Sequence, residues 1–185
     1  MPASRDINAL ILVMLQEYED IAEYLISADS LNTRARTRYY KAAYYTSAQI
    51  VELLIYMIVL QACDRQPELL ESFKTRAEVN VHDLSASRLG STKKLHITET
   101  LDRASTINEV VKNLATMIAF CNSQKLVGTN LGKKLDRIRI KRNDIHLHLR
   151  TSQARTYTKA HIDQLADTTH QLIAIFLSMH HPSAP

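Results

Sequence analysis

The chain has 185 residues, which one domain of ordinary size can fill and which suffices to bury a core without disulfides or a metal. With only 3 glycines and 4 prolines, it is poor in the residues that break helices, so long helices are expected and a loop-rich, disulfide-stapled secreted scaffold is excluded. The net charge of +4, with histidines neutral, is mildly basic and does not by itself establish a polyanionic partner.

Apolar residues that recur at helical spacing predict helices, in chain order, at about residues 4–28, 31–62, 68–79, 99–122, 131–149 and 159–179. Residues 80–98 lack this periodicity and are expected to form a long surface loop or a partly ordered insertion. Strand-like alternation is not sustained anywhere. The predicted fold class is therefore all-α, an up-and-down helical bundle of four long helices with a short accessory helix.

Two apolar stretches bear on localisation. The N-terminal stretch after Arg5 is followed by QEYEDIAEY, which carries four carboxylates and no small-residue cleavage site. The run VELLIYMIVL is interrupted by Glu52 and is short for a bilayer, which needs about 20 residues. We expect a cytoplasmic protein without a membrane partner.

The two cysteines, Cys63 and Cys121, lie singly in apolar stretches and are expected to be buried, reduced thiols. Four histidines are scattered without the spacing of metal ligands: His82, His96, His161 and His170. Neither a metal site nor a cofactor is predicted.

Residues 131–150 carry the most informative pattern. On a helix, one narrow stripe contains Leu131, Leu135, Ile138, Ile145 and Leu149. Arg142 falls in the same stripe, where a guanidinium needs a carboxylate, a phosphate or a water-filled cleft. Arg139, Asn143 and His146 lie on the sector beside it.

Two interpretations of Arg142 remain open from the pattern alone. In a structural one, Arg142 pairs with a buried acid such as Glu52, and Asn143 caps a turn. In a functional one, the arginine, the amide and an imidazole form a site on one flank of the helix.

At this point the chain resembles the HEPN family, helical domains named for their occurrence in higher eukaryotes and prokaryotes. The family signature is an arginine, usually followed by a polar residue such as asparagine, and then a histidine after a gap of four to six residues. Residues 142–148, Arg-Asn-Asp-Ile-His-Leu-His, supply this signature with five residues between Arg142 and His148. Residues 1–181 are accordingly interpreted as a single HEPN-like domain with a loop insertion near 80–98, followed by a tail at 182–185.

The resemblance implies a metal-independent endoribonuclease, in which the ribose 2′-OH attacks the adjacent phosphate and leaves a 2′,3′-cyclic phosphate. His148 is the expected proton-transfer group, and Arg142 the expected donor to the charged transition state. Asn143 can hold the phosphate or orient the imidazole, and Asp144 can bond His148 and raise its pKa.

Two positions depart from the simplest version of the pattern. His146 lies nearer Arg142 on a regular helix than His148 does, so either histidine is a candidate for the catalytic one. In a toxin subgroup, a tyrosine two positions after the histidine is modified by a partner enzyme. Here that position is Arg150, which does not support silencing of this kind.

Cations near the motif and in a second basic segment are candidates for RNA binding. They are Arg139, Lys141 and Arg150 beside the motif, and Arg34, Arg36 and Arg38 in the segment RARTRYYKAAYY. Interleaved cations and aromatic rings are typical of single-stranded RNA binding, but they also suit a helix with solvated arginines and packed tyrosines.

The expected partners are RNA and a second copy of the chain, and an antitoxin or regulatory protein is a further candidate, as for family members in toxin–antitoxin or phage-defence systems. Within residues 131–149, Ile140 and Leu147 share a second apolar stripe, which suits a dimer with a composite active site. Two alternatives stay open: a catalytically inactive HEPN-type domain that binds RNA, a nucleotide or a protein, and a plain helical interaction protein.

Overall fold

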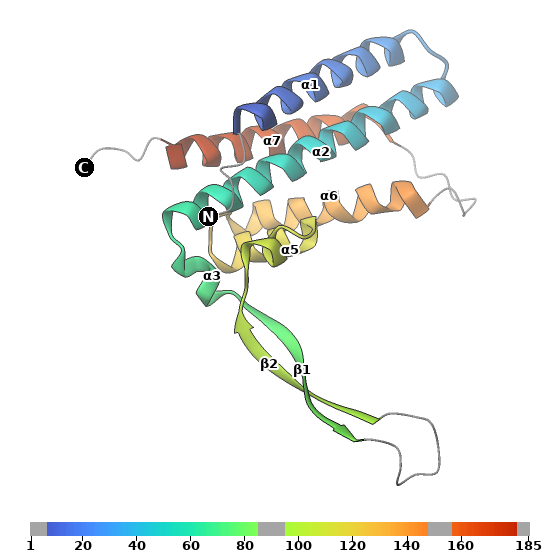
Figure 1. Ribbon diagram of the computed structural model, residues 1–185. Helices are drawn as coiled ribbons and strands as arrows, with labels where there is room; N and C mark the ends of the chain where they lie inside the picture. The colour runs from blue at the N-terminus through green and yellow to red at the C-terminus, as the bar shows by residue number, and fades with distance from the viewer. Residues whose placement is uncertain (1–6, 85–94, 148–156, 181–185) are drawn as a thin grey trace.

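The protein is mostly helical, as predicted, with one two-stranded β-hairpin extending from the helices (Figure 1). This computed structural model describes residues 7–84, 95–147 and 157–180. Side chains are outside the description at residues 7, 8, 34, 75–84, 95–102, 144–147 and 180.

Seven helices are found in the described part: α1 (Ile7–Asp29), α2 (Thr33–Arg65), α3 (Glu68–Ser72), α4 (Ile107–Val110), α5 (Leu114–Ser123), α6 (Thr129–Leu147) and α7 (Lys159–His180). The predicted helices at 4–28, 31–62, 131–149 and 159–179 agree with α1, α2, α6 and α7 to within a few residues. In Figure 1, α1 and α6 run in one direction and α2 and α7 in the other.

Helix α2 is the centre of the core, because α1, α5, α6 and α7 all contact it. Its second half has almost no exposed side chains and includes Ile50, Val51, Leu54, Ile55 and Ile58. Asn32 caps its start by accepting a hydrogen bond from the backbone N–H of Ala35 at 3.1 Å. The start of the helix is therefore set by the Asn32 cap, and Pro67 follows its end.

Two expectations for residues 74–104 were wrong. The helix expected at 68–79 ends at Ser72, and the one expected at 99–122 is replaced by the end of a strand and two shorter helices. Strands β1 (Lys74–Leu84) and β2 (Leu95–Ala104) pair antiparallel, with a register shift between Asn80 and His82. Of the segment expected to be a loop insertion, residues 80–84 and 95–98 are therefore strand, and residues 85–94 lie outside the described part.

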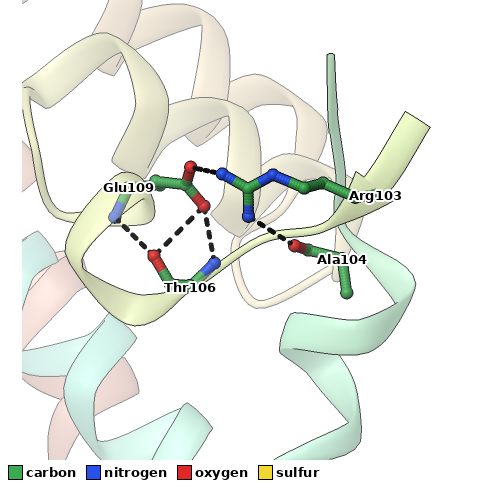
Figure 2. A network of polar contacts seen from close by, with 4 residues as sticks. All are labelled: Arg103, Ala104, Thr106 and Glu109. Carbon is green, nitrogen blue, oxygen red and sulfur yellow. Dashed lines mark hydrogen bonds and ion pairs between the residues drawn. The ribbon is translucent and has the colours of Figure 1, made fainter. Parts of the chain in front are cut away.

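A capping box fixes the point where β2 gives way to α4 (Figure 2). The Thr106 hydroxyl accepts from the Glu109 backbone N–H at 3.4 Å, and the Glu109 carboxylate accepts from the Thr106 N–H at 2.8 Å. Arg103 also contacts the Glu109 carboxylate. These hydrogen bonds hold the pKa of Glu109 below its usual value, and the one from the Thr106 backbone N–H has the largest effect.

Helix α2 is also long and apolar enough over Ala35–Arg65 to cross a membrane, by length and composition alone. It extends beyond the ten-residue run considered in the sequence. However, 67% of its most apolar window is buried inside the protein, as in the core helix of a globular domain.

Candidate functional site

Helix α6 positions the residues of the signature. Leu131, Leu135 and Ile138 are buried, so the predicted core stripe is confirmed along the first three turns. Arg142 continues this stripe, and its side chain is 23% exposed. The helix therefore directs a guanidinium toward the inside of the protein, where an apolar residue would be expected.

Glu52 of α2 is the partner of that guanidinium. The Arg142 Nη2 atom lies 2.9 Å from Glu52 Oε2, and the glutamate side chain is 28% exposed. The ion pair anticipated in the structural interpretation is thus present. The guanidinium also lies over the Tyr45 ring, 6.0 Å from its centroid, which is within the range of a cation–π contact.

One donor of Arg142 is not satisfied by the pair. Its Nε atom is buried and has no hydrogen-bond partner in the described protein. An unbonded buried donor costs on the order of 1–3 kcal/mol, and such groups are rare in native proteins. The ion pair with Glu52 therefore leaves the Nε donor available to a further acceptor.

A cleft of about 330 Å³ opens beside the ion pair, between α1, α2, α6 and the start of α5. Its polar lining consists of Glu17, Gln49, Glu52, Tyr56 and Arg142. Burial, with the nearby charge of Asp20, raises the pKa of Glu17 above its ordinary value. A higher pKa lets this carboxyl hold a proton nearer to neutral pH than usual.

Of the remaining signature residues, only Asn143 has a described side chain. Asn143 follows Arg142 on α6 and is exposed. Asp144 and His146 belong to the last turns of α6, with side chains outside the description, and His148 and Arg150 lie beyond the described residues. The choice between His146 and His148 therefore stays a prediction.

Lys141, expected to bind RNA, lies in an aromatic cluster instead of projecting into solvent. Its ammonium is 5.2 Å from the Tyr44 ring centroid and 5.1 Å from that of Tyr157. The two rings are themselves in contact, with centroids 5.3 Å apart, and both are buried. The cluster ties the second half of α6 to α2 and to the segment before α7.

His161 completes this cluster. Its ring lies edge-on to Tyr44, and its Nδ1 accepts a hydrogen bond from the Thr158 backbone N–H at 3.2 Å at the start of α7. Burial, and then the nearby charge of Lys141, lower the pKa of His161. A proton on Nδ1 would also oppose the Thr158 N–H, so the neutral imidazole fits this position.

The other cations predicted to bind RNA have varied surroundings. Arg139 pairs with Asp136, at 2.8 Å, one turn back on α6. Arg36 donates to the carbonyls of Ala28 at 3.2 Å and Leu31 at 3.0 Å, and so caps the end of α1. Arg38 is exposed, and the side chain of Arg34 is outside the description.

Within the described residues, no group of three or more histidine, cysteine, aspartate or glutamate side chains could hold a metal ion.

Comparison with models of known protein families, with curated proteins and with solved structures found no match. The resemblance to HEPN domains rests on the residues of the chain alone.

Sequence reasoning named Arg142 and Glu52, but it missed Glu17 and Tyr157 and gave His161 no role. Glu17 belongs to the acidic run of α1, and nothing in that run distinguishes it from its neighbours. Tyr157 and His161 lie in the link and helix after the motif, and only tertiary packing brings them to Lys141.

Proposed function

We propose that the protein is a HEPN-type ribonuclease that cleaves RNA without a metal ion, as a toxin or defence effector in the cytoplasm. The observation that supports this most is the placement of Arg142, a cleft-lining guanidinium held by Glu52 at 2.9 Å, with a buried Nε that finds no acceptor among the described residues. Asn143 lies beside it on α6.

The chemistry divides between charge stabilisation and proton transfer. The 2′-oxygen forms a bond to phosphorus as its proton passes to a base, and the bond from phosphorus to the 5′-oxygen breaks as that oxygen is protonated. Negative charge grows on the phosphoryl oxygens between these events. Arg142, with a planar set of donors, is the group that stabilises this charge, and Asn143 holds a phosphoryl oxygen.

Proton transfer is assigned to His148, with His146 as the alternative. Histidine titrates near neutral pH and can act both as base and as acid in such a reaction. Asp144 precedes His148 by four residues and can orient the imidazole by a hydrogen bond.

The HEPN assignment includes the finer architecture, an up-and-down bundle of four long helices, for which α1, α2, α6 and α7 are the candidates. It also includes a homodimer in which two signature segments line one cleft. A non-catalytic HEPN-type domain that binds RNA, a nucleotide or a protein is the second candidate. The ion pair with Glu52 favours this second candidate, because the pair neutralises the charge of Arg142.

RNA incubated with the purified protein in EDTA separates these functions. We expect cleavage by the wild type, a large loss in His148→Ala and a smaller one in His146→Ala. If the two effects are reversed, His146 is the catalytic histidine. RNA that is bound but left intact by the wild type would establish the non-catalytic alternative.

A further inference from the structure

A second groove lies on the other side of α6 from Arg142. It has a volume of about 790 Å³ and runs between α5 and the first half of α6. Small apolar residues form part of it, including Ala115, Ala119 and Val127. Its cations are Lys125, Lys133 and Arg137, all of them exposed.

The cations of the basic segment KKLDRIRIKR, residues 133–142, fall into two groups: those with a partner in the protein and those without one among the described residues. Four of these cations have partners inside the protein. Lys134 pairs with Asp167 at 2.8 Å, Arg139 with Asp136 at 2.8 Å and Arg142 with Glu52 at 2.9 Å, while Lys141 lies between two tyrosine rings.

Lys133 and Arg137 are different, because among the described residues neither has an acidic partner. They are four residues apart, and therefore lie on one face of α6, about 6 Å apart along its axis. Asp136 is the one carboxylate in the groove lining, and Arg139 already neutralises it. The groove thus presents uncompensated positive charge.

Lys125 adds a third cation at some cost to the backbone. Its φ is 55°, in the left-handed region. It follows Gln124, the C-cap of α5, at the point where the Leu126 N–H donates to the Cys121 carbonyl at 2.9 Å. Glycine is the residue that this helix-ending geometry favours. A lysine in this backbone conformation is less stable than a glycine would be, so any benefit of Lys125 must come from its side chain.

Gly132 lies on the α6 wall of the groove. The side-chain amide of Asn122 on α5 lies against the backbone of α6 at Gly132, in the space that a Cβ would occupy. The α6 wall of the groove also includes Asp136, and Asn143 lies seven residues further along the same flank, about 10 Å along the axis.

We propose that this groove binds the phosphate backbone of single-stranded RNA and directs the strand along α6 toward Asn143. Cations and small apolar residues, without an aromatic ring in the lining, suit contact with phosphates and sugars and not recognition of bases. This inference rests on the proposed ribonuclease function but concerns a site separate from the signature.

Binding is measured apart from cleavage, by fluorescence anisotropy with a labelled 2′-O-methylated oligouridine, which lacks the nucleophile. We expect Lys133→Gln/Arg137→Gln to weaken binding roughly 10-fold at low salt and to reduce the salt-dependence slope by about 1.4, the value for two phosphate contacts on a single strand. The matched control, Arg65→Gln/Lys74→Gln, removes two exposed cations outside the groove and should bind like the wild type.

Lys125→Gly provides a test in which loss of folding cannot produce the result. Because glycine suits a φ of 55°, this variant should unfold at a higher temperature than the wild type and yet bind the oligonucleotide several-fold more weakly. Equal binding by the wild type, Lys125→Gly and the groove double variant would overturn the proposal, as would a wild type that does not bind RNA. If the wild type binds RNA through the groove but cleaves none, the RNA-binding role of the groove is supported and the proposed ribonuclease activity is refuted.

Discussion

Arg142 occupies a position on α6 where the helical pattern calls for an apolar side chain. The sequence predicted this placement because the residues before it, Leu135 and Ile138, fix which face of the helix is buried. It also named Glu52 as a possible partner, which the structure confirms at 2.9 Å. It could not predict the unbonded Nε or the cleft, since both depend on the distance between α2 and α6.

Replacing Arg142 separates its two roles. The pair with Glu52 is intermediate in burial, so Arg142→Ala should lower the free energy of unfolding by about 1–2 kcal/mol, between the values for exposed and buried pairs. Loss of a transition-state donor should lower the cleavage rate on the order of 100-fold. Chemical denaturation and single-turnover cleavage measure the two effects.

Glu52→Gln is the matched control, because it breaks the same ion pair and keeps the guanidinium. We expect a similar loss of stability and retention of most cleavage activity. Equal activity in wild type and Arg142→Ala, with equal destabilisation in both variants, would mean that the pair is purely structural.

The two cysteines should be inert in the folded protein. Burial raises the pKa of Cys63 to about 11 and that of Cys121 to about 12, so almost none of either thiol is ionised at pH 8. A thiol reagent such as Ellman's should label neither cysteine until denaturant is added. Rapid labelling of the native protein at pH 8 would contradict this account of the core.

At the scale of elements, the long helices were predictable and the hairpin was not. Residues 31–62 and 131–149 carry continuous helical patterns that α2 and α6 follow. Ala77, Val79 and Val81 do alternate as in a strand, but the interpretation split this stretch at Asn80 into the end of a helix and the start of a loop. The pairing of β1 with β2 joins residues about 10 to 30 apart in sequence, which local periodicity does not reveal.

The contact between α6 and α7 should make stability depend on pH through His161. Its pKa is lowered in the folded protein, so the unfolded chain takes up the proton first as the pH falls. The contribution of His161 is therefore complete above the ordinary pKa of 6.5 and is lost as the pH falls from there through the lower folded-state value.

Denaturant unfolding at pH 7.5 and at stepwise lower pH, in the wild type and in His161→Gln, measures this dependence. We expect the fall in stability below about pH 6.5 to be smaller in the variant, because glutamine does not titrate. Parallel curves for the two proteins would show that His161 is not the group responsible.

At the scale of the whole molecule, we propose a homodimer formed around α6. Ile140 is 47% exposed, in agreement with its place on a second apolar stripe, while the side chain of Leu147 lies outside the described part. Ile140→Asp should therefore lower dimer affinity and cleavage together, with little change in monomer stability. Light scattering at micromolar concentration measures the first effect.

Helix α1 supplies the control surface for that experiment, because it exposes Leu12 and Leu15. Leu12→Asp/Leu15→Asp should leave the dimer intact. A dimer that is sensitive to the α1 variant and not to Ile140→Asp would place the interface elsewhere, and a strict monomer that cleaves RNA would rule out the composite site.

The central claim, RNA cleavage by attack of the 2′-OH, is tested most directly by the ends of the products. An RNA strand is incubated in EDTA with the wild type and with His148→Ala, and the product termini are identified by mass spectrometry. The account predicts 2′,3′-cyclic phosphate and 5′-hydroxyl ends from the wild type, little product from the variant, and no cleavage where the ribose is 2′-deoxy. Products with 5′-phosphate and 3′-hydroxyl ends, or an intact strand in every sample, would contradict it.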